Sequence, residues 1–436
     1  MQKISKLIIT IIFLVEYVVH GLFYPFVILL LPFYGPLRKR FKAELKFNKV
    51  QLQLSTDYCF EVSSEGEYEQ IASVMMYLLK SDIKVQLIIA SESLIKKADQ
   101  LNQQYGHLDV RMVPLASFFW INLPFSSNLY SLIKAQNLIL CRYDFFPELM
   151  LLGGLGNRKF SLVSASLKCK KLTGVNKIYW QGVYSLFDLV VPASKLEESH
   201  IRKLLPAFQS ESFDFRQLQI ISRIENCQDI LNNWKHFSYF HEKLQLFPKR
   251  KRVIFGSCWE EECLAFSNQN FINDLLNGTL FLVIAPHNIN IEYIEMLITK
   301  IQSYHSDLII NVINDKTTPV SKAHVHIIQK SGILVELYSF FGHCFVGGGY
   351  GRSIHSVLEP FMSECLVYCG PKTHRSTEFD LIQAQHKERV IVVEQAAHFY
   401  NNLQEKIAAE INTVIINRDD LNKSFKWQLS RLIEGP

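Results

Sequence analysis

The chain has 436 residues, of which 48% are hydrophobic and 20% are charged, and its formal net charge is +5. This length exceeds one ordinary core and predicts two domains, each with enough apolar residues to fill its interior. The basic residues form no continuous stripe, which argues against a nucleic-acid partner. The nine cysteines are scattered without a CxxC pair, so we expect reduced core thiols and neither a zinc site nor a disulfide framework.

The N-terminal segment has the pattern of a membrane anchor. Residues 7–33 are almost wholly apolar, and a basic cluster follows at 38–46. About 20 apolar residues can cross a bilayer as a helix, and the basic cluster predicts that the rest of the chain lies in the cytoplasm. Glu16 and Pro25 disfavour a straight span, so a single span and a monotopic pair of helices bent at Pro25 both remain open. A buried core helix is a third interpretation, which the basic flank disfavours.

The rest of the chain alternates between short apolar strands and amphipathic helices. This alternation predicts parallel sheets with right-handed crossovers. We expect strands at 50–54, 58–62, 85–90, 110–113, 138–141, 160–164, 189–191, 253–256, 280–285, 325–329, 343–346, 366–368 and 389–393. We expect helices at 67–79, 291–301, 353–363, 399–411 and 419–433.

Two such series in tandem predict the α/β GT-B architecture, in which two Rossmann-like domains face a cleft. The expected organisation is an anchor with its basic flank (1–45), an N-terminal domain on the acceptor side (46–225), a polar and aromatic linker (226–250) and a C-terminal nucleotide-binding domain that includes the terminal helix (251–436). Ligands of such sheets bind at the carboxyl ends of the strands, so polar residues just after a strand are the candidate site residues.

The first candidate is Glu67, which follows the strand at 58–62 and a small polar turn. A carboxylate at a strand end could accept the proton of a sugar hydroxyl. The competing interpretation is an ordinary carboxylate in the first turn of a helix, and spacing alone favours that interpretation.

Two further turns offer weaker signals. Ser257 follows the strand at 253–256, where a hydroxyl and free helix amides could bind phosphate, although serine is also a common helix cap. His287 follows the strand at 280–285 and could donate a hydrogen bond to a phosphate, although a lone histidine is more often structural.

Residues 343–360 carry the strongest motif, a strand followed by Gly347, Gly348 and Gly349 and then by a predicted helix from about Ser353. Glycines allow the backbone to approach an anion, and the helix N-terminus adds its dipole. Glu359 lies four residues after His355, on the same face of that predicted helix, where its carboxylate could bind ribose hydroxyls. The absence of Gly-Lys-Ser/Thr after the glycines excludes a P-loop. A tight turn that only needs glycine is the structural alternative.

Taken together, these blocks resemble the Kdo transferases, which add 3-deoxy-D-manno-octulosonic acid (Kdo) to a lipid A precursor. The resemblance runs in the same order from the apolar N-terminus to about residue 410. The matching blocks are Ser-Glu-Gly-Glu-Tyr-Glu-Gln at 64–70 (family Ser-Val/Leu-Gly-Glu-Phe-Glu-Gln), Arg-Tyr-Asp-Phe-Phe-Pro at 142–147 (Lys-Tyr-Glu-Phe-Trp-Pro), Ser-Arg-Ile-Glu at 222–225 (Thr-Arg-Phe-Asp), Gly-Ser-Cys-Trp-Glu-Glu at 256–261 (Gly-Ser-Thr-Trp/His-x-Glu), Ala-Pro-His at 285–287, Phe-Val-Gly-Gly-Gly-Tyr-Gly at 345–351 (Val-Gly-Gly-Gly-Phe-Gly), Ile-His-Ser-Val-Leu-Glu-Pro at 354–360 (Ile-His-Asn-x-Leu-Glu-Pro) and Cys-Gly-Pro at 369–371 (Phe-Gly-Pro).

The resemblance implies an inverting transfer of Kdo from CMP-Kdo to lipid IVA during synthesis of the lipopolysaccharide inner core, with no metal and no cofactor. It implies that Glu67 is the catalytic base, and that the enzyme works at the cytoplasmic face of the inner membrane, on an anionic lipid surface. Asp144 and Ser64 are the implied acceptor-side residues. The implied donor-side residues are Ser257, Cys258, His287, Gly347, Gly348, Gly349, Ile354, His355, Ser356 and Glu359.

Three of these positions depart from the family pattern, because Asp144 replaces Glu, Cys258 replaces Thr and Ser356 replaces Asn. Two alternatives therefore stay open. One is another membrane-surface GT-B transferase that uses a UDP-sugar, and the other is a non-catalytic relative that binds a nucleotide or a lipid.

Overall fold

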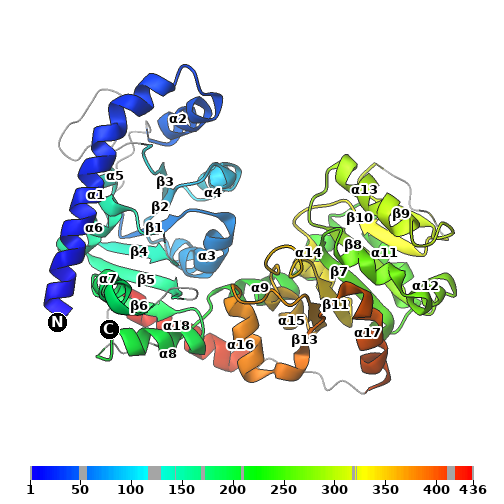
Figure 1. The fold of residues 1–436 in the computed structure, drawn as a ribbon. Coiled ribbons are helices and arrows are strands. Elements are labelled where there is room, and N and C mark those ends of the chain that lie inside the picture. Colours follow the sequence, from blue (N-terminus) through cyan, green and yellow to red (C-terminus); the bar gives the residue numbers. More distant parts are fainter. Residues whose placement is uncertain are drawn as a thin grey trace. The chain divides into compact units, whose positions relative to one another are not determined.

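The computed structural model describes residues 2–48, 56–115, 129–142, 144–167, 172–207, 211–316, 320, 322–409 and 418–434. The predicted strand at 50–54 and the last residues of the helix expected at 399–411 lie outside the described residues. The chain forms two compact units, residues 1–219 with 419–436 and residues 220–418. Each unit is built on its own parallel sheet (Figure 1).

Within its described residues, the first unit has a six-stranded sheet in the order β3-β2-β1-β4-β5-β6, with every neighbouring pair parallel. The strands are β1 (Tyr58–Val62), β2 (Val85–Ile89), β3 (Leu108–Met112), β4 (Asn137–Cys141), β5 (Lys159–Ala165) and β6 (Leu189–Pro192). The helices are α1 (Gln2–Leu30), α2 (Gly35–Asn48), α3 (Glu65–Lys80), α4 (Ile95–Gln104), α5 (Leu129–Leu132), α6 (Pro147–Leu155), α7 (Gly174–Tyr184), α8 (Lys195–Leu204) and α18 (Arg418–Glu434), with the 3-10 turn η1 (Glu92–Leu94).

The described part of the second unit has a seven-stranded parallel sheet in the order β13-β12-β11-β7-β8-β10-β9. Its strands are β7 (Arg252–Cys258), β8 (Phe281–Pro286), β9 (Ile310–Ile313), β10 (Val325–Ile328), β11 (His343–Val346), β12 (Leu366–Cys369) and β13 (Val390–Val392). Its helices are α10 (Cys227–Asn232), α11 (Phe237–Gln245), α12 (Gln269–Leu276), α13 (Ile291–Gln302), α14 (Leu334–Tyr338), α15 (Leu358–Met362), α16 (Thr377–Gln385) and α17 (Phe399–Ala408), with 3-10 turns η2 (Lys249–Lys251), η3 (Glu262–Ser267), η4 (Lys387–Arg389) and η5 (Ala396–His398). Helix α9 (Arg216–Glu225) contains the boundary between the units.

Both sheets confirm the predicted parallel α/β architecture. The central strands are buried along their whole length, which explains their nearly continuous apolar sequence. Strand β9 was not predicted, because its alternating burial gives a weaker apolar signal.

Two sequence-based assignments are wrong. Residues 226–250 are no linker, since they form α10 and α11. Trp234, between these helices, packs on Phe240 of α11, which also contacts Phe281 of β8. The terminal helix α18 belongs to the first unit, because Phe425 and Leu429 are buried in the core of that unit. Amphipathic spacing identifies an apolar face but does not say which core will bury it.

Candidate functional site

The order of the first sheet places two sequence motifs side by side. Strands β1 and β4 are neighbours at the point where the strand order reverses, and such a switch point is where open α/β sheets bind ligands. Glu67 follows β1 and Asp144 follows β4. The negative charge of Asp144 acts on the carboxyl group of Glu67, so two of the predicted residues meet at this edge.

Glu67 also has a structural role, as a carboxylate in the first turn of helix α3. Ser64 is the N-cap of α3, and its hydroxyl accepts a hydrogen bond from the amide of Glu67 at 3.3 Å. In return, Oε2 of Glu67 accepts a hydrogen bond from the amide of Ser63 at 2.7 Å. This is close to a capping box, which satisfies two free amides at the start of a helix. The same contacts hold the carboxyl group in place beside Asp144.

The electrostatic environment of Glu67 departs strongly from that of an exposed carboxylate. Burial, together with the negative charge of Asp144, raises the pKa of Glu67 to about 7, while the guanidinium of Arg142 acts in the opposite direction. Burial also raises the pKa of Glu61, the last but one residue of β1, with a further contribution from Glu67. Burial and neighbouring negative charge both disfavour the ionised form, which is why the pKa values of Glu61 and Glu67 are raised. A base with a pKa near 7 is well matched to proton transfer at physiological pH.

A buried amide fixes Arg142 next to this carboxyl pair. Gln70 of α3 is 2% exposed, and its amide oxygen accepts hydrogen bonds from Nε and Nη2 of Arg142 at 2.7 and 2.8 Å. Its amide nitrogen donates to Oγ of Ser164 at 2.7 Å. Arg142 and Ser164 both have a positive φ, of 62° and 53°, at the carboxyl ends of β4 and β5. Strained residues of this kind cluster at functional sites, and the network holds the charge that acts on Glu67.

The glycine-rich turn of the second unit follows β11, which lies beside β7 at the switch point of that sheet. Gly348 and Gly349 have φ values of 87° and 92°, in the left-handed region. A Cβ atom on Gly347 would lie 2.0 Å from the carbonyl oxygen of Ser257. Close packing of the backbone is therefore enough to require glycines in this turn, as expected for a tight turn without a bound ligand.

The helix expected at 353–363 is wrong in its first half. Residues 353–357 are not helical, and α15 begins at Leu358 and ends at Met362. His355 therefore precedes the helix and does not share a helical face with Glu359; its amide instead donates to the carbonyl of Gly347 at 3.1 Å. Glu359 lies in the first turn of α15.

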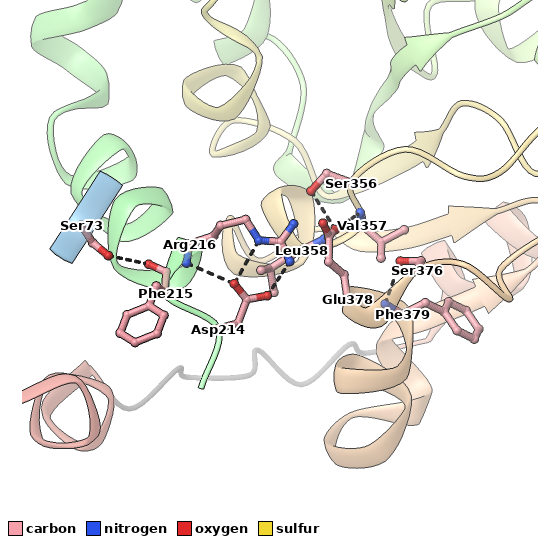
Figure 2. Close-up of polar contacts among 10 residues, drawn as sticks. All are labelled: Ser73, Asp214, Phe215, Arg216, Ser356, Val357, Leu358, Ser376, Glu378 and Phe379. Atoms are coloured by element: carbon pink, nitrogen blue, oxygen red, sulfur yellow. Dashed lines mark hydrogen bonds and ion pairs between the residues drawn. The ribbon is translucent and has the colours of Figure 1, made fainter. Parts of the chain in front are cut away.

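A carboxylate from a later helix occupies the start of α15 (Figure 2). Oε2 of Glu378, on α16, accepts hydrogen bonds from Oγ of Ser356 at 2.8 Å and from the amides of Val357 and Leu358 at 2.9 and 3.1 Å. Glu378 is buried, and α16 is itself capped by Ser376, which accepts from the amide of Phe379. The expected role of this helix start as a phosphate site is therefore corrected, because an internal anion already fills it.

An aromatic stack lies at the carboxyl ends of β7, β8 and β11. The ring of Trp259 stacks on His287 at 3.8 Å between centroids, and His287 lies 4.5 Å from His355. Nε1 of Trp259 donates to Nε2 of His355 at 2.8 Å, and the guanidinium of Arg352 lies 3.6 Å from the Trp259 ring centroid. This stack brings together the predicted residues His287 and His355, with an arginine that can supply positive charge.

The protonation of His355 follows from these contacts. Burial, with the neighbouring His287 and Arg352, lowers the pKa of His355 to about 4, and the pKa of His287 is lowered as well. Since Nε2 of His355 accepts from Trp259, its proton lies on Nδ1. Neutral histidines can donate a hydrogen bond to a phosphate, and the cation at this edge is Arg352, which also pairs with Glu261 at 3.5 Å.

The remaining donor-side residues surround the glycine turn. Ser257, with a φ of 51°, is the last but one residue of β7, and its backbone packs against Gly347. The thiol of Cys258 is buried and donates to the carbonyl of Trp259. Ile354 is buried near Gly349. Below the turn, Glu262 accepts hydrogen bonds from the amides of Trp259 and Gly348, and burial raises its pKa to about 8.

Several residues around both sites were not assigned from the sequence. Glu61 carried a signal, as a carboxylate within an otherwise apolar strand, and Trp259 and Arg352 lay inside quoted motifs without a role. Gln70 likewise ended a quoted block without a role, and Glu378 gave no signal, because its partners lie about 20 residues away. Among the described residues, no group of three or more His, Cys, Asp or Glu side chains could hold a metal ion.

Comparison with known proteins shows the fold. No protein-family model matches the chain, and no curated protein matches it. Among solved structures, UDP-GlcNAc 2-epimerase from Neisseria meningitidis, bound to UDP-GlcNAc, has 13% identity and a TM-score of 0.54, covering 86% of this chain and 100% of that one. The UDP-GlcNAc 2-epimerase from Methanocaldococcus jannaschii has 8% identity and a TM-score of 0.54, covering 86% and 99%. The chain therefore has a GT-B-type fold.

A further solved structure is the C-terminal CMP-Kdo binding domain of WaaA from Acinetobacter baumannii. It has 16% identity and covers 49% of this chain and 98% of that domain. Its TM-score is 0.34.

Proposed function

We propose that the protein is a nucleotide-sugar-dependent glycosyltransferase that moves Kdo from CMP-Kdo to a lipid A precursor with inversion, at the cytoplasmic face of the inner membrane. The observation that carries the proposal is the carboxyl pair of Glu67 and Asp144, in which Glu67 has a pKa of about 7 at the ligand-binding edge of the first sheet. The ordered sequence blocks that resemble Kdo transferases support the choice of donor.

In this proposal Glu67 removes the proton from the acceptor hydroxyl as that oxygen attacks the anomeric carbon. Asp144 lies on the acceptor side together with Ser64. The amide of Ser63 and the guanidinium of Arg142 hold the carboxylate in its ionised form. General-base catalysis of this kind contributes about 10²- to 10⁴-fold to the rate.

In the second unit, the leaving CMP is held by the glycine turn 347–349 and the stack of Trp259, His287 and His355. Because both histidines are neutral, Arg352 supplies the charge that stabilises the leaving phosphate. Glu359 binds the ribose hydroxyls, and Ser257 assists at the phosphate. No metal and no cofactor enters this scheme.

The alternative is a GT-B enzyme that uses a UDP-sugar. It is favoured by the departures at two donor positions, since the thiol of Cys258 is buried and Oγ of Ser356 is bound to Glu378. Both side chains are therefore engaged within the protein. A non-catalytic relative that binds a nucleotide or a lipid is the remaining alternative.

Nucleotide release by the detergent-solubilised protein tests the proposal. CMP-Kdo and a set of UDP-sugars are supplied in turn, with and without a tetra-acylated lipid A precursor, to the wild type and to Glu67→Ala. The proposal predicts CMP release that needs the acceptor and collapses in the variant. Release of UDP instead would show that the donor is a UDP-sugar. No release from any donor by the folded protein would support the non-catalytic alternative.

A further inference from the structure

Helix α1 is attached to the first unit by one narrow stripe. Residues at every fourth position are buried, namely Ser5, Ile9, Phe13, Tyr17 and Gly21. They pack against α6 and α7, on the same side of the sheet (Figure 1). The contact is close, since a Cβ atom on Gly182 of α7 would lie 2.7 Å from the carbonyl oxygen of Ser5 and 3.0 Å from Cβ of Ile9.

The part of α1 that extends beyond its docked stripe is too short to cross a membrane. The stripe runs from Ser5 to Gly21, about 24 Å of helix at about 1.5 Å per residue. Only residues 22–30 extend beyond it, which is about 13 Å against a hydrocarbon core of about 30 Å. Although Ile4–Leu30 is long and apolar enough to cross a membrane, α1 cannot cross one while it is packed on this domain.

The other faces of α1 are apolar and exposed. Leu7, Leu14, Leu22 and Phe26 are among the exposed side chains. Glu16, the acidic residue in this segment, interacts with Tyr179 of α7 and so lies on the side of the domain.

Neighbouring elements extend this surface. Val175 and Ile178 of α7 are exposed and lie on the same helical row as Gly182, which contacts α1. The next helix, α2, begins at Gly35 and exposes Arg38 and Lys42. An apolar surface followed directly by basic residues matches an anionic lipid surface, with acyl chains against the former and headgroups against the latter.

We infer that α1 lies in the plane of the membrane, with one stripe on the first unit and its outer faces in the lipid, so that both chain ends are on one side of the bilayer. This deepens the membrane attachment that forms part of the proposed function and rests on it for the lipid partner. Neither test below measures transfer, so a failure of attachment and a failure of transfer are distinguishable.

The first test measures topology in vesicles made from the inner membrane of cells that express the full chain with a different epitope tag at each end. Protease is added without and then with detergent. An in-plane helix predicts that both tags are digested together or protected together. Digestion of the C-terminal tag with protection of the N-terminal tag until detergent is added would show a span and overturn the inference.

The second test measures sedimentation with vesicles of anionic or zwitterionic lipid. Leu22→Asp should release the protein from both vesicle types, while the control Leu246→Asp, at an equally exposed leucine of the second unit, should not. Arg38→Gln and Lys42→Gln should each weaken binding to anionic vesicles roughly fivefold and leave zwitterionic binding unchanged. A Leu22→Asp protein that sediments like the wild type, or a wild type that stays soluble as a dimer, would overturn the inference.

Discussion

Replacing Glu67 by Gln should change how the stability of the protein depends on pH. Burial and Asp144 raise the pKa of Glu67 from 4.5 to about 7. Ionising this carboxyl in the folded protein therefore costs up to about 3 kcal/mol more than in the unfolded chain, at about 1.4 kcal/mol per pKa unit. The cost is absent below pH 4.5, grows as the pH rises towards 7 and is fully present above it. Glutamine removes the cost and keeps an acceptor for the amide of Ser63.

The free energy of unfolding in urea, measured for both proteins at about pH 5 and about pH 8, tests this prediction. Between the two conditions, Glu67→Gln should gain up to about 3 kcal/mol relative to the wild type. Glu61 and Glu262, whose pKa values are also raised, are present in both proteins and largely cancel. Glu65→Gln, at an exposed position in the same helical turn, should show no such change. An unchanged difference between Glu67→Gln and the wild type at the two pH values would refute the reasoning.

Three further substitutions test the supporting network. Gln70→Ala removes the acceptor for Arg142 and should lower the free energy of unfolding in urea by about 1–3 kcal/mol. A loss of less than about 0.5 kcal/mol would show that the contact is dispensable. Glu378→Ala leaves the first amides of α15 without their acceptor and should cost a similar amount, whereas exposed Glu388→Ala should cost nothing measurable. Gly348→Ala should lower the melting temperature and the soluble yield, because its φ is 87° and a Cβ would lie 2.4 Å from a backbone oxygen; wild-type values would contradict that geometry.

The sheets and the strand-end motifs could be predicted because parallel strands buried on both faces are continuous apolar runs. That pattern located β1 and β4, and with β1 the candidate Glu67 just after its end, whereas Asp144 was assigned from the resemblance alone. The meeting of the two carboxyls could not be predicted, because it depends on the strand order 3-2-1-4-5-6, which local sequence does not specify.

The errors arose where a distant residue decides the local structure. The segment from Ser353 has apolar residues at helical spacing, yet His355 bonds to Gly347 and Trp259 and the helix starts only where Glu378 caps it. The terminal helix likewise has a clear apolar face, but the core that buries Phe425 belongs to the other end of the chain.

The pH dependence of acceptor-dependent CMP release tests the proposed chemistry most directly. The wild-type rate should rise with pH through an apparent pKa of about 7, as Glu67 loses its proton and becomes a base. Glu67→Gln should reduce the rate about 10²- to 10⁴-fold at every pH, while Glu65→Gln keeps the wild-type profile. A Glu67→Gln protein that releases CMP at the wild-type rate, with the same rise through pH 7, would contradict Glu67 as the base.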